Sequence, residues 1–305
     1  MKILYMGTPD FAVLPLKKLI EDGHEIVGVI TREDKPKGRG MKVLMTPVKA
    51  VASELGIPVY QPASLKDGAL SSLLEELSPE IIVVVAYGKI LPKYILDYPE
   101  FGCINLHGSL LPKYRGSAPI QHAVLNGDKV SGVTTMLMNE GMDTGDILLK
   151  AEVELLPEET SESLFDRLSV AGADLLLKTV NEISAIEPIA QVESEATYAP
   201  PIKKENAKID WNRNAAEIIN LIRGSYSWPI AYTDSVIGRI KIYDAVEGTG
   251  KGTAGEVLSL TDEGLEVAAS DNSIVIRLFQ VESGKRMKPV EYFRGHPSIL
   301  GTYFK

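Results

Sequence analysis

The sequence predicts an α/β protein of two domains, a doubly wound sheet followed by a small antiparallel β-barrel. Its 305 residues are enough to form two hydrophobic cores. In the first half, short aliphatic runs alternate with amphipathic segments, and in the last third short strands recur at regular spacing between turn residues. A content of 45% hydrophobic and 24% charged residues is ordinary for a globular protein, which excludes the disordered and fibrous classes.

The first half contains repeated pairs of one strand and one helix. A strand is expected in the run KILYMG at residues 2–7, and an amphipathic helix in 10–23. The repeat continues with strands at 25–31, 57–61 and 81–86 and helices at 47–56 and 69–80. Unbroken aliphatic runs such as IIVVVA are typical of parallel strands that are buried on both faces, and such sheets bind ligands beyond the carboxyl ends of their strands.

The turn after the first strand, Gly7-Thr8-Pro9-Asp10-Phe11, does not match a dinucleotide site. It lacks the G-x-G-x-x-G pattern, and Pro9 removes a backbone N–H that a pyrophosphate group would need. A nicotinamide-dependent oxidoreductase is therefore disfavoured. Gly7 is better explained as a tight turn between the strand and the helix.

The second half begins with a long helix and ends in strands. Apolar residues at helical spacing predict the helix at 161–183, and the Pro-Pro pair and charges of APPIKKENAK at 199–208 indicate a linker. A short helix at 215–224 precedes the strands expected at 230–236, 238–247, 255–263, 265–271 and 273–281. We therefore expect a catalytic domain at 1–198, the linker at 199–208 and a barrel domain at 209–305.

Charge is distributed unevenly along the chain. The net charge is -9, yet residues 203–305 contain 14 Lys or Arg against 13 Asp or Glu, so the first 202 residues carry -10. Within that acidic part, residues 31–50 contain six basic side chains against Glu33 and Asp34. A short basic run is usually a solvated loop, but it is also the pattern of a phosphate-binding segment.

The chain is expected to be cytoplasmic. Cys103 is a single cysteine, so no disulfide can form within the chain, and the first residues hold too short an apolar stretch for a signal peptide. The aliphatic run at 81–86 is far below the roughly 20 residues that cross a bilayer, so no membrane segment is expected.

Polar residues interrupt the apolar run CINLHGSLLPKYRGSAP, which begins at Cys103. If Ile104 and Leu106 lie in a strand, then Asn105 and His107 share the opposite face at the strand's end. Such residues often only satisfy neighbouring backbone groups. Together with a carboxylate they also form a catalytic set.

Asp143 lies in the polar stretch NEGMDTGDILL and supplies that carboxylate if its loop faces His107; Asp146 is better explained as closing a turn. The set fits acyl transfer to an amine. His107 would move the proton, Asn105 would hydrogen-bond the oxyanion, and Asp143 would orient the imidazole and strengthen it as a base. An oxyanion donor contributes roughly 3 to 4 kcal/mol, and acid–base catalysis about 100- to 10,000-fold.

Serine and metal hydrolases fit the sequence less well. Ser109 does not lie in a G-x-S-x-G elbow and follows His107 too closely to form a triad easily. The histidines at 24, 107, 122 and 296 lack metal-ligand spacing, so no metal is expected.

Several motifs resemble the methionyl-tRNA formyltransferase family over nearly the whole chain. They are MGTPDFAV, DKPKGRG, NLHGSLLPKYRGSAPIQ, GMDTGDIL, ATYAPPI, AKIDW, GKRM and FRG. The resemblance implies a Rossmann-like formyltransferase domain followed by an OB-like barrel, and it implies 10-formyltetrahydrofolate as co-substrate. It assigns catalysis to Asn105, His107 and Asp143. It further implies that the folate site is lined by Ser109, Leu110, Leu111 and Pro112, with Tyr87, Gly88 and Ile90 of the AYGKILP loop near the pterin.

The resemblance also assigns the basic loop to the acceptor stem of the initiator tRNA. Lys35, Lys37, Arg39 and Lys42 are then the expected tRNA contacts, and Lys208, Arg223, Lys285 and Arg286 are weaker candidates. Physically, such residues neutralise phosphates and make the affinity depend on salt. Ser227 and Ile230 depart from the family's pattern, which has Pro before the Trp-Pro pair and Gly after it.

The expected activity is formyl transfer from 10-formyltetrahydrofolate to the α-amine of methionyl initiator tRNA, by a monomer. A formyltransferase acting on a small amine, such as an amino sugar or glycinamide ribonucleotide, is the alternative enzyme, because it would share the Asn105 and Asp143 motifs. A folate- or RNA-binding protein without catalysis is disfavoured, since the full Asn105, His107 and Asp143 set is present.

Overall fold

The computed structural model describes residues 1–37 and 42–305, and the chain divides into two compact units. The first unit comprises Met1–Pro119, Val130–Glu154 and Phe165–Ala199, and the second comprises Ile120–Lys129, Leu155–Leu164 and Pro200–Lys305. The chain enters the second unit for the last time after Ala199, at the start of the predicted linker.

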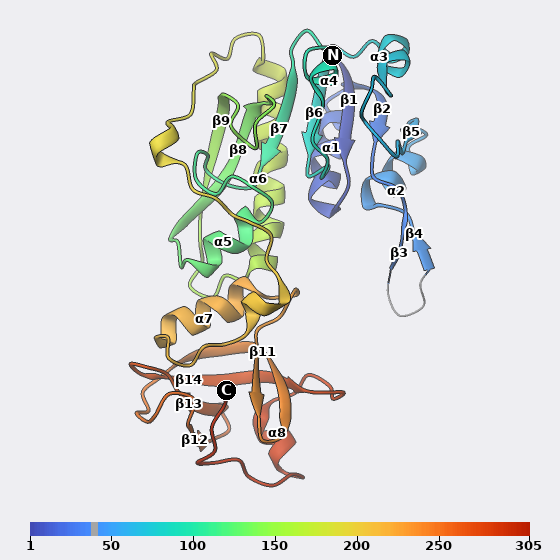
Figure 1. The fold of residues 1–305 in the computed structure, drawn as a ribbon. Coiled ribbons are helices and arrows are strands. Elements are labelled where there is room, and N and C mark those ends of the chain that lie inside the picture. Colours follow the sequence, from blue (N-terminus) through green and yellow to red (C-terminus); the bar gives the residue numbers. More distant parts are fainter. Residues whose placement is uncertain (38–41) are drawn as a thin grey trace. The chain divides into compact units, whose positions relative to one another are not determined.

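The first unit contains a mixed sheet in the order β5-β2-β1-β6-β7-β8-β9 (Figure 1). Its strands are β1 (Lys2–Gly7), β2 (Glu25–Ile30), β5 (Val59–Tyr60), β6 (Ile81–Val85), β7 (Cys103–His107), β8 (Val130–Leu137) and β9 (Ile147–Glu154). The pairs from β5 to β7 are parallel, whereas β8 and β9 pair antiparallel. Every residue of β6 is buried, as the aliphatic run predicted.

Helices cover both faces of this sheet. The helical segments of this unit are η1 (Asp10–Ala12), α1 (Val13–Glu21), α2 (Pro47–Glu54), α3 (Ser71–Leu77), α4 (Lys93–Leu96), α6 (Ser161–Glu182) and η2 (Glu193–Glu195). On one face, Leu106 of β7 lies against Gly172 of α6. On the other face, Cys103 shares a buried cluster with Leu74 of α3 and Ile95 of α4. This arrangement confirms the predicted Rossmann-like α/β class.

Strands β8 and β9 and the β3–β4 hairpin were not predicted from the sequence. The hairpin consists of β3 (Lys35–Lys37) and β4 (Lys42–Leu44), which pair antiparallel within the basic loop. Alternation is weak in β8, where six consecutive residues are buried, and charges occupy alternate positions of β9. Neither pattern was distinct enough to separate strand from loop.

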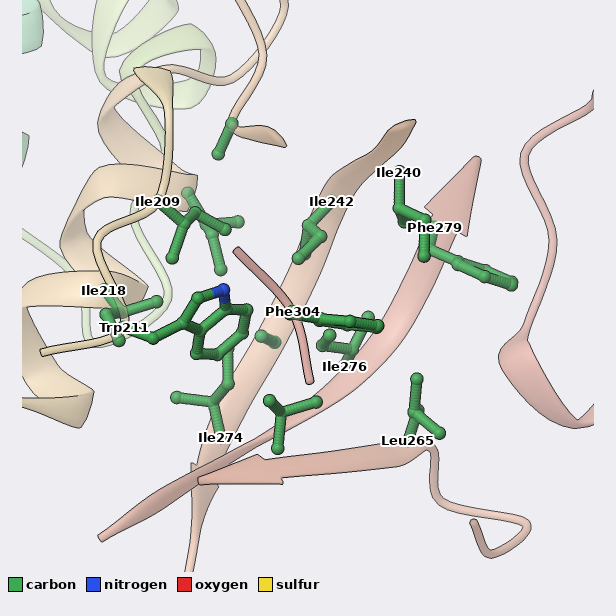
Figure 2. Close-up of a cluster of buried hydrophobic side chains, with 14 of the residues drawn as sticks. Ile209, Trp211, Ile218, Ile240, Ile242, Leu265, Ile274, Ile276, Phe279 and Phe304 are labelled. Atoms are coloured by element: carbon green, nitrogen blue, oxygen red, sulfur yellow. The ribbon is translucent and has the colours of Figure 1, made fainter. Parts of the chain in front are cut away.

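The second unit is built on an antiparallel sheet in the order β10-β11-β14-β13-β12. Its elements are α5 (Pro119–Leu125), η3 (Lys204–Ala207), α7 (Ala215–Gly224), β10 (Tyr232–Ser235), β11 (Gly238–Gly248), β12 (Val257–Leu260), β13 (Leu265–Ala268), β14 (Ser273–Val281) and α8 (Pro289–Phe293). Trp211, Ile218 of α7 and Phe304 pack with the inner residues of the strands in one buried cluster (Figure 2).

The end of the chain hydrogen-bonds to both edge strands of this sheet. The amide of Val257 in β12 donates to the carbonyl of Thr302 over 2.9 Å, and the amide of Asp234 in β10 donates to that of Lys305 over 3.1 Å. Phe304 between them is 3% exposed, and its ring centroid lies 5.7 Å from that of Trp211. The sheet is therefore curled, which agrees with the predicted OB-like barrel.

The two departures from the family pattern lie in left-handed backbone. Ser227 has φ 64° and Ile230 has φ 72°. Proline cannot adopt the conformation found at Ser227, and glycine would adopt that at Ile230 without strain, since the left-handed region costs roughly 1–2 kcal/mol for other residues. The backbone at Ser227 is therefore one that the family's proline could not adopt, whereas the backbone at Ile230 is one that the family's glycine would adopt.

We predict that Phe304→Ala destabilises the second unit by about 3–5 kcal/mol, because it removes a buried ring and weakens the closure of the sheet. Thermal unfolding monitored by circular dichroism should show a lowered transition. Leu300→Ala is the control, since Leu300 is 50% exposed and should change stability by at most about 0.5 kcal/mol. Equal melting curves for the Phe304 variant and the wild type would contradict this account of the C-terminus.

Candidate active site

Strand β7 carries Asn105 and His107 on the face away from α6. Leu106 between them lies against Gly172 of α6, and side chains alternate along a strand. Asn105 pairs in register with Val84 of β6 and with Met136 of β8. Because β7 is hydrogen-bonded on both sides, it provides a rigid base for both side chains.

Each nitrogen of the His107 ring faces a protein oxygen, and the side chain is 7% exposed. Its Nε2 lies 2.9 Å from the carbonyl oxygen of Tyr114. A carbonyl only accepts hydrogen bonds, so in the neutral ring the proton is on Nε2. The lone pair is then on Nδ1, which faces Oδ2 of Asp143 at 3.8 Å. Nδ1 is the atom that can accept a proton.

Asp143 reaches His107 through a loop that leaves the sheet at the opposite end of β7. The amide of Met138, just after β8, donates to the carbonyl of Cys103 at the start of β7, so the loop must return along the face of the sheet. Asp143 has φ 54° and accepts at Oδ2 from the amide of Gly116 over 2.7 Å. The return brings the carboxylate to the ring, whereas Asp146 stays exposed.

Two buried polar atoms near the carboxyl ends of β6 and β7 have no hydrogen-bond partner among the described residues. They are Oδ1 of Asn105 and the hydroxyl of Tyr87. Burial raises the pKa of Tyr87 to about 12, although the nearby Arg32 acts in the opposite direction. An unpaired buried polar group costs about 1–3 kcal/mol, so both atoms are suited to accept a ligand's hydrogen bond or donate one to it.

The segment Ser109–Pro112 follows β7 and is tied to β8. The hydroxyl of Thr134 donates to the carbonyl of Ser109 over 2.7 Å and accepts from the amide of Leu111 over 3.1 Å. Ser109 donates its hydroxyl to the carbonyl of Lys113 over 2.6 Å, which disfavours it as a nucleophile. Leu111 is buried with Met136, Leu110 lies over Gly132, and Pro112 is buried. These contacts fix the backbone of the segment.

The loop after β6 holds the other predicted folate residues. Gly88 has φ +77°, and its carbonyl oxygen lies 3.4 Å from Nη1 of Arg32. The hydroxyl of Thr8 donates to the carbonyl of Tyr87 over 3.3 Å. Ile90 is 83% exposed, which is unusual for so apolar a side chain.

The base of the basic hairpin is anchored by a polar cluster. Lys49 donates to Asp34 over 2.5 Å and Gln61 donates to Asp34 over 2.8 Å, and these two hydrogen bonds lower the pKa of Asp34. Lys49 also donates to Gln61 over 2.7 Å. Lys35 at the start of β3 is exposed, and the backbones of Lys37 and Lys42 pair with each other. Arg39 lies outside the described residues. Lys49 thus serves the structure of the hairpin, and Lys35 remains free to meet solvent.

Within residues 1–37 and 42–305, no group of three or more His, Cys, Asp or Glu side chains could hold a metal ion. In the same part of the chain no helix is long and apolar enough to cross a membrane.

Comparison with known proteins identifies the family. Residues 1–180 match the family model described as formyl transferase, and residues 201–297 match that described as formyl transferase, C-terminal domain. The methionyl-tRNA formyltransferase of Alkaliphilus oremlandii is 47% identical over 99% of this chain and 99% of its own length. The chain belongs to the methionyl-tRNA formyltransferase family. The Caldanaerobacter subterraneus relative of the same name is 46% identical over all of both chains.

Solved structures show the same formyltransferase fold. The N-formyltransferase from Helicobacter canadensis, solved with folinic acid and dTDP-3-aminofucose, has a TM-score of 0.67 at 19% identity and covers 94% of this chain and 100% of its own. HypX from Aquifex aeolicus, solved with tetrahydrofolic acid, has a TM-score of 0.65 at 17% identity and covers 100% of this chain and 51% of its own.

Three residues that were not predicted from the sequence contact the predicted catalytic set. Tyr114 and Gly116 contact His107 and Asp143 through backbone atoms, which side-chain chemistry does not reveal. Gln191 donates to the carbonyl of Asp143 over 2.8 Å from 48 residues away. Tyr114 and Gly116 lie in the quoted motif NLHGSLLPKYRGSAPIQ, so that motif could have pointed to them; no pattern pointed to Gln191.

We predict that Tyr87→Phe leaves stability unchanged or raises it slightly, because it removes a buried hydroxyl without a protein partner. If that hydroxyl contacts the folate, the same variant should bind tetrahydrofolate about tenfold more weakly, the loss of one hydrogen bond. Thermal melting with and without tetrahydrofolate measures both effects. Tyr94→Phe is the control, since that hydroxyl donates to the carbonyl of Leu65 over 2.8 Å and its loss should lower stability. A large loss of stability in the Tyr87 variant would show that its hydroxyl is paired.

Proposed function

We propose that this chain transfers the formyl group of 10-formyltetrahydrofolate to the α-amine of methionyl initiator tRNA, in the cytoplasm, for the initiation of translation. Membership of the methionyl-tRNA formyltransferase family over the full chain is the observation that carries this function. The gathering of Asn105, His107 and Asp143 beside β7 supports the reaction type.

The reaction needs an unprotonated amine and one net proton transfer. The amine nitrogen attacks the formyl carbon, the bond between that carbon and N10 breaks, and the proton lost by the amine is balanced by the proton gained at N10. An ester-linked amino acid has a less basic amine than a free one, so modest base assistance is enough. The formyl donor is already activated, which makes a nucleophile on the protein unnecessary.

His107 is proposed to receive or relay that proton at Nδ1. The hydrogen bond between Nε2 and Tyr114 keeps the lone pair on Nδ1, and the carboxylate of Asp143 at 3.8 Å favours the charged ring that forms. The distance exceeds that of a hydrogen bond, so the carboxylate acts on the ring by charge, and the two groups form an ion pair only once the ring is protonated.

Asn105 is proposed to stabilise the tetrahedral intermediate. Its amide N–H₂ group can donate to the oxyanion, and its unpaired Oδ1 can accept from the attacking amine. The nitrogen and the oxygen of the Asn105 side chain, which β7 holds in place, would then act on adjacent atoms of the reacting centre. The unpaired Oδ1 therefore has a chemical use in this reaction.

The folate site is proposed to lie along the segments that follow β6 and β7. Ser109, Leu110, Leu111 and Pro112 would line it with the backbone that Thr134 fixes. Tyr87, Gly88 and Ile90 would contact the pterin. The absence of a Cβ at Gly88 allows a flat ring to approach the backbone closely.

Recognition of the tRNA is proposed to use the basic hairpin and the C-terminal unit. Lys35, Lys37, Arg39 and Lys42 would neutralise phosphates of the acceptor stem. The +1 charge of residues 203–305 permits RNA to approach, whereas the -10 charge of the remainder limits nonspecific binding. We propose that the protein acts as a monomer.

The first test is formyl transfer to initiator and elongator methionyl-tRNA side by side, with glycinamide ribonucleotide as a competing acceptor. We expect a strong preference for the initiator species, measured as kcat/KM. Activity on the small amine alone would keep the catalytic set and overturn the proposed tRNA substrate.

We predict that His107→Ala lowers kcat by about 100- to 10,000-fold while the affinity for tetrahydrofolate stays near that of the wild type. Single-turnover kinetics and fluorescence titration measure the two quantities. His24→Ala is the matched control, because His24 bonds Asn181 of α6 and should leave turnover unchanged. Unchanged turnover in the His107 variant would remove His107 from the mechanism.

We predict that Lys35→Ala weakens initiator tRNA use and lowers the slope of log affinity against log salt by about one. Filter binding at several salt concentrations measures the slope, and folate binding should be unaffected. Lys17→Ala removes the same charge from the exposed side of α1 and serves as the control. Equal slopes for both variants would argue against a phosphate contact at Lys35.

A further inference from the structure

Gln191 connects to the turn that carries Asp143. Its Nε2 donates to the carbonyl of Asp143 over 2.8 Å and to the carbonyl of Gly145 over 2.7 Å. One side-chain amide therefore holds two backbone oxygens of the same turn. Gly145 leaves this turn little freedom, since a Cβ there would lie only 1.6 Å from the carbonyl oxygen of Leu137.

Arg115 sets the orientation of the Gln191 amide. Its Nε and Nη2 donate to Oε1 of Gln191 over 3.1 and 3.0 Å, and its Nη1 pairs with Glu193 at 2.8 Å. Because a guanidinium only donates, Oε1 must face Arg115 and the N–H₂ group must face the turn. Arg115 is 1% exposed, so this orientation is held inside the protein rather than in solvent.

The neighbours of Arg115 in the chain hold the other two groups of the set. The carbonyl of Tyr114 faces Nε2 of His107, and the amide of Gly116 donates to Oδ2 of Asp143. Arg115 itself is anchored to the segment after Gln191, since its amide donates to Thr197 and its carbonyl accepts from Ala199, both over 2.8 Å. Residues 114–116 thus connect the imidazole, the carboxylate and the Gln191 amide.

We propose that Arg115 and Gln191 are positioning residues that hold the carboxylate of Asp143 against His107 during formyl transfer. The inference rests on the proposed function, and it assigns a kinetic role to a pair outside the predicted catalytic set. Asp143 sits in left-handed backbone, at φ 54°, a conformation that needs support from its surroundings. Gln191 supplies that support by donating hydrogen bonds to the carbonyls of Asp143 and Gly145.

Gln191→Glu tests the proposal with little change in size. The carboxylate keeps its contact with Arg115, now as an ion pair, but it places an acceptor where the N–H₂ group met two carbonyls. We expect kcat to fall about 10- to 100-fold, because a displacement of roughly 1 Å costs this much. The KM for tRNA and the affinity for tetrahydrofolate should stay near the wild-type values, whereas the melting temperature should fall, because two hydrogen bonds to backbone carbonyls are lost.

Glu193→Gln is the matched control. Glu193 contacts Arg115 but not the 143–145 turn, and its side chain is 75% exposed. We expect it to keep the wild-type kcat. If both variants lose turnover equally, or if the Gln191 variant keeps it, the proposal is wrong.

A double-mutant cycle separates a positioning role from a general structural one. In an Asp143→Ala background, Gln191→Glu should lower kcat no further, because the group that Gln191 positions is already absent. If Gln191→Glu lowers kcat by the same factor in both backgrounds, Gln191 acts elsewhere than on Asp143.

Hydrogen exchange provides a readout that does not depend on activity. The Gly116 amide is protected by Asp143, so we expect it to exchange faster in the Gln191 variant, as measured by nuclear magnetic resonance. If the wild type fails to formylate methionyl-tRNA while this exchange still rises, the proposed function falls and the structural connection stands. Unchanged exchange would overturn the connection itself.

Discussion

Side-chain alternation along β7 is the constraint on which the candidate active site depends. Leu106 must face α6, where Gly172 leaves room for it, and this orientation turns Asn105 and His107 toward the opposite face. A shift of one residue would bury both polar side chains against α6. Pairing with β6 on one side and β8 on the other prevents that shift.

The carboxylate reaches this face by a different route. The loop after β8 starts near Cys103 and returns along the sheet, so Asp143 comes from the end opposite to the one where His107 lies. Three contacts fix the position of this loop. They are the close approach of Gly145 to the carbonyl of Leu137, the hydrogen bond from the Gly116 amide to Asp143, and the hydrogen bond from Gln191 to the carbonyl of Gly145. The site is therefore assembled from a rigid strand and a turn held by several backbone contacts.

Basic residues of the first unit divide into structural and exposed ones. Lys49 is bound by Asp34 and Gln61, and Arg32 approaches the carbonyl of Gly88, so neither counts simply as free positive charge. Lys35 at the start of the hairpin stays exposed. Net charge along a sequence therefore overstates the charge that a partner can meet, because part of it is paired within the fold.

The sequence alone determined the fold class, the family and the polar face of β7, because these follow from periodicity and from contiguous motifs. The strands at 2–7 and 273–281 and the helix at 215–224 have the predicted bounds, since local patterns specify them. Only the tertiary structure decided that β8 and β9 are antiparallel and that Asp143 meets His107. It also revealed the hydrogen bonds that Gln191 donates to the turn of Asp143. That side chain acts on backbone oxygens 46 and 48 residues away, and no local pattern encodes such contacts.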